Sequence, residues 1–199
     1  LSIHYAQLVA IVLIVLLTFI NTKGVQTGKV IQTIFTSTKL ISLFGLIIAG
    51  LFVFKSDVWN ANWSHAWDIQ KLTKSADGTI NYEPLISGVA LGAIASAMVG
   101  SIFSSDAWNN VTFIAGEIKN PKRNIGLSLL FGTLIVTVIY VMMNVVYLAT
   151  VPLHDLAFAK DNRVALSASE AIFGSSGTII IAVMIMISTF GCNNGLILA

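Results

Sequence analysis

The sequence predicts an all-α, polytopic membrane protein, and three observations lead to this fold class. First, 56% of the 199 residues are hydrophobic and only 10% are charged, with a mean hydropathy of +0.86. A soluble domain carries about 25% charged residues, because its surface faces water. Second, the apolar residues gather in runs long enough to cross a bilayer, and third, most charges lie between these runs. The outer surface should therefore contact lipid, and the net charge of +2 gives no reason to expect a nucleic-acid partner.

Five apolar segments approach or exceed the roughly 20 residues that a helix needs to cross the hydrocarbon core. We expect these helices at about 5–21, 30–54, 84–117, 125–151 and 171–199. Helices are the expected spanning form because lipid offers backbone groups no partners, and the runs are too long for barrel strands. The whole chain, 1–199, is expected to be a single transmembrane domain. Since it begins without a methionine and stops inside an apolar run, we expect an internal fragment of a longer membrane protein.

The connections between these segments differ in charge and predict the orientation. The connections at 21–29 and 117–124 carry an excess of lysine and arginine, whereas those at 55–83 and 152–170 carry slightly more acidic than basic residues. Short cytoplasmic loops are enriched in positive residues. The first and third connections are therefore expected in the cytoplasm and the other two outside, in a multi-pass arrangement in the plasma or inner cell membrane.

The long outer connection carries three tryptophans at four-residue spacing, Trp59, Trp63 and Trp67. On a helix they would share one face, which suits an anchor at the membrane interface, with a substrate gate as the alternative. Asn62-Trp63-Ser64 matches a glycosylation sequon, a triplet that is also common by chance.

The third apolar segment, 84–117, predicts a discontinuous helix. A straight helix of this length would measure roughly 50 Å against a hydrocarbon core of about 30 Å. A polar cluster from Ser101 to Asn110 lies near its middle and includes Asp106. An ionisable side chain at this depth costs at least about 2.5 kcal/mol, so it should face protein or a wet cavity. Serine and aspartate also compete for backbone hydrogen bonds and weaken the helix there.

We therefore expect half-helices at about 84–102 and 108–117, with the break near 103–107. Unwound backbone at this depth is tolerated where it lines a cavity or is buried in protein. Its free carbonyl and N–H groups suit the ammonium and carboxylate of an amino acid, or a coupling ion. The alternative is a kinked helix whose serines and Asp106 bond only to neighbouring helices.

Lys39 is the other ionisable residue inside a predicted span. It lies about ten residues beyond Lys29, or roughly 15 Å along a helix, which is near the middle of the core. Either it snorkels to the cytoplasmic interface, or its ammonium occupies a cation site between helices as a fixed charge or a proton carrier. The polar run in the last segment offers candidate partners, Ser188 and Thr189, and candidate polar lining, Asn193 and Asn194. Polar contacts that merely join helices are the equally weighted alternative for this run.

No pattern typical of an enzyme is present. His4, His65 and His154 are dispersed, with no cysteine or acid at metal-ligand spacing. There is no P-loop or dinucleotide-binding glycine pattern, and the lone Cys192 gives no disulfide framework. We therefore predict no catalytic residues, no metal and no cofactor.

The residues that line the predicted break also resemble a known family. Phe103 to Asn110, followed by Glu117 to Asn124, is similar to the sixth helix and following loop of the amino acid–polyamine–organocation superfamily. The nearest branch resembles the L-type amino acid transporters and the bacterial serine/threonine exchangers. Further similarities to this branch lie in Asn21 with Val25, in Gln32 to Lys39, and in Phe190-Gly191 with Asn194-Gly195. The resemblance implies a twelve-helix, inverted-repeat transporter fold, of which this chain holds about helices four to eight.

The resemblance also implies a function and site residues. It implies sodium-independent exchange of neutral amino acids by alternating access, with the amino acid substrate and the bilayer as partners and the oligomeric state open. The implied substrate-binding residues are Ile102, Phe103, Ser104, Ser105, Asp106 and Ala107, and the implied gate or supporting residues are Trp108 and Asn109. Lys39 matches a lysine that several relatives place where sodium binds in sodium-coupled cousins. Ser105 and Ala107 depart from the aromatic residue and glycine that are usual in the branch, which leaves side-chain selectivity open.

Two alternatives remain beside the exchanger. One is a proton-coupled amino acid or amine symporter with the same fold. The other, from a different class, is a channel or a non-transporting membrane subunit built from the same helices.

Overall fold

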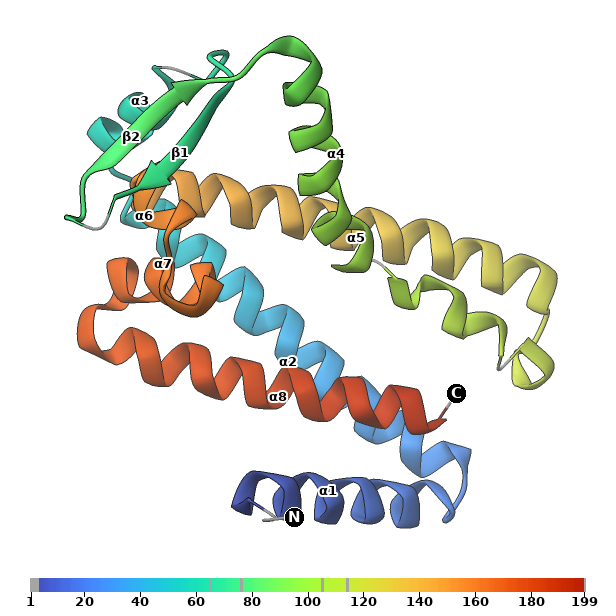
Figure 1. The fold of residues 1–199 in the computed structure, drawn as a ribbon. Coiled ribbons are helices and arrows are strands. Elements are labelled where there is room, and N and C mark those ends of the chain that lie inside the picture. The colour runs from blue at the N-terminus through green and yellow to red at the C-terminus, as the bar shows by residue number, and fades with distance from the viewer. Residues whose placement is uncertain (1–3, 65, 76, 105, 114, 199) are drawn as a thin grey trace.

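The computed structural model describes residues 4–64, 66–75, 77–104, 106–113 and 115–198 (Figure 1). Within them, four stretches are long and apolar enough to cross a membrane: Gln26–Phe52, Gly88–Thr112, Pro121–Thr150 and Val164–Ile197. A fifth apolar helix, α1 (Tyr5–Asn21), is shorter. The prediction of an all-α polytopic membrane protein is confirmed.

The ends of two long helices follow from local chemistry. Helix α2 (Val25–Phe52) begins after Gly24, whose φ of +121° favours glycine, and so starts five residues before the predicted position 30. Helix α5 (Pro121–Thr150) begins with Pro121 at its first position, where the missing N–H costs no helical hydrogen bond.

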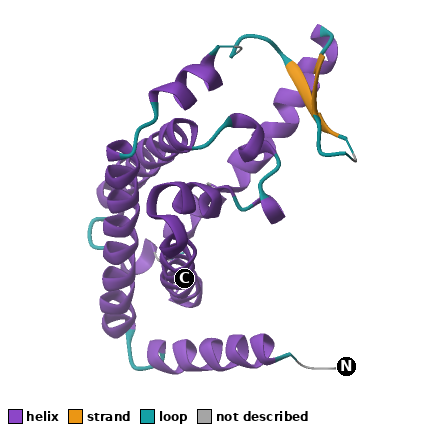
Figure 2. Ribbon diagram, turned by 90° about the vertical axis from the view of Figure 1, so that its left-hand side faces the viewer, coloured by secondary structure: helices purple, strands orange, loops and turns teal. Residues whose placement is uncertain are grey.

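The outer connection between α2 and α4 (Ser87–Ser104) contains a short helix that carries two of the tryptophans and a hairpin that the sequence did not predict. It holds helix α3 (Ser56–Trp63) and an antiparallel hairpin of β1 (Gln70–Lys74) and β2 (Ile80–Pro84). Figure 2 shows this small ribbon at one edge of an otherwise helical molecule.

Two of the three tryptophans that were expected to share one helix face do lie together on α3. The rings of Trp59 and Trp63 lie on α3 with their centroids 5.4 Å apart. Trp67 lies beyond the end of α3 and is 93% exposed, because the helix stops at Trp63. The shared-face prediction is therefore wrong for Trp67.

The last predicted span, 171–199, is interrupted near its start. Helix α7 (Val164–Phe173) and the single 3-10 turn η4 (Gly174–Ser176) precede helix α8 (Gly177–Leu198). Gly174 has a φ of +63°, which breaks the helical path. A Cβ on Gly177 would collide with the Ser169 carbonyl oxygen, so glycine is needed where α8 leaves α7. Two short elements, α6 (Leu153–Ala157) and η3 (Lys160–Asn162), join α5 to α7.

The apolar core lies where α2, α5 and α8 converge beside α7. Its buried residues are Leu46, Ile47, Ile139, Met143, Val146 and Ile181. Elsewhere α1, α4 and most of α5 present large apolar side chains outward. Such surfaces suit lipid or further helices rather than water.

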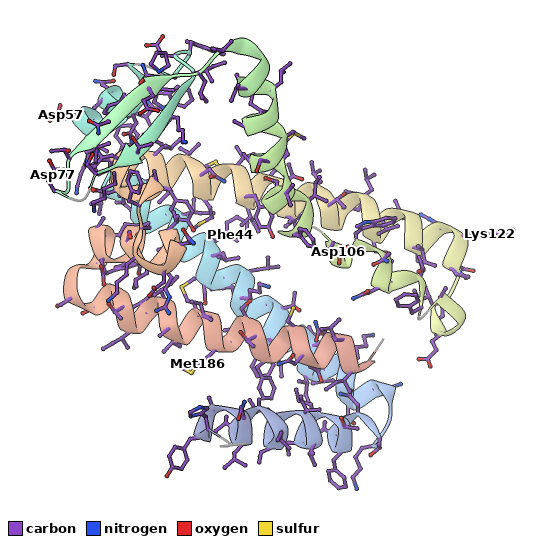
Figure 3. The ribbon with its side chains drawn as sticks, viewed as in Figure 1. Phe44, Asp57, Asp77, Asp106, Lys122 and Met186 are labelled. Carbon is purple, nitrogen blue, oxygen red and sulfur yellow. The ribbon has the colours of Figure 1, made fainter. Side chains whose placement is uncertain are left out.

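A basic residue of one connection and acidic residues of another lie at opposite ends of the molecule, as the charges of the connections suggested. Figure 3 places Lys122, in the basic start of α5, at one end of the molecule, and Asp57 and Asp77 at the opposite end. The α1–α2 connection lies at the same end as Lys122 (Figure 1). We call this the inner end, and the end with the hairpin the outer end.

Candidate functional site

The helix break lies in the segment predicted to bind substrate. The α-helical hydrogen-bonding pattern of α4 ends at Ser104, and the 3-10 helix η1 (Asp106–Thr112) begins two residues later. Ser105 lies outside the described residues, and the structure describes only the backbone of Ser104 and Ala107. A second 3-10 turn, η2 (Ala115–Glu117), leads towards α5.

A groove of about 940 Å³ runs between this segment and α5. Its wall on the α4–η1 side includes Gly100, Ser101, Trp108 and Val111. Its α5 wall is apolar but carries a series of polar side chains: Ser128, Thr133, Thr137, Tyr140 and Asn144. Ligand pockets are typically about 300–1,000 Å³, mostly apolar with a few polar groups, and this groove fits that description.

The predicted substrate-binding residues are largely uncovered. Ile102, Phe103 and Trp108 are 64%, 76% and 60% exposed, and Asp106 and Asn109 are also exposed. Figure 3 places Asp106 beside α5, between α4 and the following 3-10 helix. The candidate site is thus a groove that α4, η1 and α5 line, and several of the predicted substrate-binding residues are exposed beside it.

Lys39 is half-buried, and its four-residue spacing from Phe35 puts the two residues on one face of α2. The ring of Phe35 stacks on Phe190 with the centroids 4.4 Å apart. Because the two helices run antiparallel, the position one turn beyond Phe35 lies level with Ser188. By this register we expect Lys39 at about the level of Ser188, which is half-buried, while Thr189 is exposed.

Asn194 is fully buried, and its amide bonds to neighbouring helices. Its Nδ2 donates to the Gly28 carbonyl oxygen at 3.3 Å and to Gln32 Oε1 at 3.0 Å. Its Oδ1 accepts from Asn21 Nδ2 at 3.1 Å. These bonds favour the interhelical alternative for Asn194, whereas Asn193 is half-buried and makes none of them.

The two sets of candidate residues lie in different parts of the structure. The segment after α4 contacts α5, while Lys39 lies on α2 and Ser188 on α8, two helices that pack against each other. Among the described residues, no group of three or more His, Cys, Asp or Glu side chains is placed to hold a metal ion.

The sequence analysis missed the polar residues of α5. Ser128, Tyr140 and Asn144 occupy one four-residue row of the helix, with Gly132 between them. A row of this spacing lies on one helix face, so the signal was present in the sequence. It was overlooked because none of these residues is charged.

Comparison with known proteins agrees with these features. The family model described as "Amino acid permease" matches residues 4–199. The chain is 28% identical to the b(0,+)-type amino acid transporter 1 of Oryctolagus cuniculus over 184 residues, which cover 92% of this chain and 33% of that protein. It is 28% identical to the serine/threonine exchanger SteT of Bacillus subtilis over 194 residues, covering 98% of this chain and 39% of the relative.

A further relative is the human large neutral amino acids transporter small subunit 2, 27% identical over 191 residues, which cover 95% of this chain and 32% of that protein. The chain thus spans about a third of the length of these relatives. The family match, however, extends over almost the whole chain, including the helix break and the α2–α8 interface. The chain belongs to the amino acid permease family.

Proposed function

We propose that the full-length protein is a secondary active transporter, not an enzyme, that exchanges neutral amino acids across a membrane without sodium by alternating access. The names of two relatives support exchange and neutral amino acid substrates. One relative is named a serine/threonine exchanger, and another is named a large neutral amino acids transporter subunit. The amino acid is the proposed substrate.

The observation that carries the proposal is the break between α4 and η1 inside a membrane-length apolar segment. In general, the last carbonyls of an α-helix and the first N–H groups of the helix that follows have no partner within a continuous helix, so such a break can present them to a ligand. Carbonyls suit an ammonium and N–H groups suit a carboxylate, which are the two constant groups of every amino acid.

The proposed substrate contacts are residues 102–107, with Trp108 and Asn109 as gate or support. Trp108 already borders the groove with α5, where an amphipathic indole can close over a bound side chain while Tyr140 and Asn144 offer polar contacts. The exposed residues beside the groove are proposed to be covered by parts of the full-length protein outside these 199 residues.

Lys39 is proposed to act as a fixed cation in the α2–α8 interface, where it would replace a coupling ion. A positive charge held permanently there would make the transport cycle independent of sodium. The same half-buried lysine also favours the second candidate, a proton-coupled symporter in which Lys39 carries the proton.

Counterflow in proteoliposomes containing the full-length protein tests the proposal. An exchanger takes up labelled neutral amino acid faster when unlabelled substrate is inside, with or without sodium and without an imposed pH gradient. A symporter responds to the pH gradient instead. A channel gives uptake that neither saturates nor is stimulated from the opposite side, and a non-transporting subunit gives none. Each of these last three results would contradict exchange.

A further inference from the structure

The α2–α8 interface consists of two chemically different halves. Towards the outer end, Leu46 and Ile47 of α2 pack with Ile181 of α8 in the apolar core. There α2 is also fastened to α5, because Gly50 lies so close to Val146 that a Cβ would collide with its side chain. Separating these surfaces would expose apolar side chains and open cavities, which is strongly unfavourable.

Towards the inner end, the contact is polar and flat. We define the Asn194 node as Asn21, Gly28, Gln32 and Asn194, which join the end of α1, the start of α2 and the last third of α8. Asn194 makes the three bonds described above, and Asn21 Nδ2 also donates to the Leu17 carbonyl oxygen at 2.9 Å. One fully buried amide therefore joins three helices.

The node lacks one hydrogen-bond donor. Asn21 Oδ1 is buried and has no partner among the described residues. A buried carbonyl oxygen without a donor is costly, and water would satisfy it. Opening the node to water therefore gives Asn21 Oδ1 a hydrogen bond that it lacks in the closed form. Opening the apolar half of the interface gives no such hydrogen bond.

Two glycines let the helices touch without interlocking. A Cβ built on Gly191 would lie 3.0 Å from Phe35 Cβ, and one built on Gly195 would lie 3.2 Å from Gln32 Nε2. At Gly191 and Gly195, α8 presents backbone to α2 beside the buried Asn194 side chain, and the stacked rings of Phe35 and Phe190 add an apolar contact. A flat contact of this kind can part without rearranging interdigitated side chains.

We propose that the Asn194 node is an inner latch. It holds the inner half of α2 against α8 while the inner side is closed, and it opens to water when that half of α2 moves away during transport. Lys39 lies one turn beyond Phe35 towards the outer end, so opening the latch gives the cytoplasmic solution access to the level of Lys39 and Ser188. This inference rests on the proposed transport function.

A reversible cross-link tests the latch in the full-length protein. In a Cys192→Ser background, Phe35→Cys with Gly191→Cys places two Cβ atoms 3.0 Å apart. A disulfide needs roughly 3.5–4.5 Å, so it can form once the two helices separate by a few tenths of an ångström to about 1 Å. The control pair, Ile47→Cys with Ile181→Cys, lies on the same helices within the apolar core cluster. Thiol titration measures how much of each pair is cross-linked.

Oxidation of the inner pair is expected to abolish counterflow, and reduction to restore it, while the oxidised outer pair continues to exchange. Full exchange by the oxidised inner pair, or equal loss from both oxidised pairs, would overturn the latch. If the wild-type protein shows no exchange at all, the proposed function fails instead.

A second measurement does not depend on transport. A single cysteine at Phe35 should react several-fold faster with a membrane-impermeant thiol reagent from the inner side when Asn194 is changed to alanine. A cysteine at Ile47 in the same background should not change. Equal rates at position 35 with and without Asn194 would overturn the proposal even if the paired variants fail to fold.

Discussion

Among single residues, Asn62 joins the outer elements to the membrane helices. Its Nδ2 donates to the carbonyl oxygens of Leu148 and Val151 at 2.8 and 3.0 Å, and its Oδ1 accepts from the Leu153 N–H at 2.7 Å. The last carbonyls of a helix have no intrahelical partner, so Asn62 caps the end of α5 from α3. The sequon asparagine thus has a structural role, and its amide nitrogen is already engaged.

Asn62→Ala should lower the free energy of unfolding by about 1–3 kcal/mol, because it removes the partners of partly buried backbone groups. Thermal unfolding of the full-length protein in detergent measures this loss. Asn60→Ala, at an exposed position on the same helix, is the control and should change little. Equal stability of the two variants would show that Asn62 does not act as a cap.

Asp106 offers a test of substrate recognition at the break. Asp106→Asn keeps the size of the side chain and removes its charge. If the carboxylate recognises the substrate ammonium, affinity should fall by about tenfold or more, since hydrogen bonds to charged groups contribute about 1.5–3 kcal/mol. Equilibrium binding measures the change, with Asp57→Asn at the outer end as control. An unchanged affinity and exchange rate would leave Asp106 a structural residue.

Lys39→Ala separates the two roles proposed for this ammonium. As a fixed cation, Lys39 is needed for the cycle itself, so the variant should lose exchange or couple it poorly. As a proton carrier, it is needed only for proton movement, so the variant should lose its pH dependence but still exchange between equal internal and external pools. Counterflow measured over a range of pH distinguishes them. Full activity with an unaltered pH profile would exclude both roles.

Among the elements, the hairpin is held together by its turn. Gly78 has a φ of +86°, and Asp77 accepts hydrogen bonds from the Thr79 hydroxyl at 2.7 Å and the Thr79 N–H at 3.0 Å. These bonds, the hydroxyl first, hold the pKa of Asp77 below its ordinary value of 3.8. Since the folded pKa lies below the unfolded one, the stabilisation is present above the ordinary pKa and disappears as pH falls through the folded pKa.

We therefore expect the hairpin to loosen on acidification below about pH 4, the ordinary aspartate pKa. Hydrogen exchange of the β1 and β2 amides, corrected for the intrinsic pH dependence, should show protection falling in the wild type. Asp77→Asn cannot titrate, so its protection should be lower at neutral pH and nearly independent of pH. Wild-type protection that stays constant down to pH 2 would contradict this role of the turn.

The spanning helices could be predicted from sequence because the bilayer imposes a minimum apolar length. The hairpin was not predicted, because β1 is mostly polar and the alternation of apolar and polar residues in β2 extends over only five residues. The interruption before α8 depends on the backbone of Gly174, which hydropathy does not report. The break after α4 was predictable because serines and an aspartate are costly inside an apolar span.

The packing around the candidate sites was only partly accessible from sequence. Asn194 stood out as a polar residue in an apolar run, but its partners Asn21 and Gln32 lie far away along the chain. Only the antiparallel packing of α2 and α8, and the position of α1, bring these amides together. The groove beside Trp108 likewise depends on where α5 lies.

For the molecule as a whole, much of the exposed surface is apolar. The chain spans about a third of its relatives' length, and α4 with the segment after it presents large apolar side chains outward. The α4 glycines Gly88, Gly92 and Gly100 have open space around them, although their spacings of four and eight residues suit close helix packing on one face. We expect further helices of the full-length protein to cover this face and complete the proposed substrate site.

Substrate protection of a cysteine at the break tests the central claim most directly. In the full-length protein with Cys192→Ser, a cysteine replacing Phe103 should react with impermeant thiol reagents applied from either side of the membrane. Neutral amino acids should slow this reaction, while a cysteine replacing Ile179, exposed near the outer end of α8, should be unaffected. Reaction from one side only, or no protection by any amino acid, would contradict an alternating-access substrate site at the helix break.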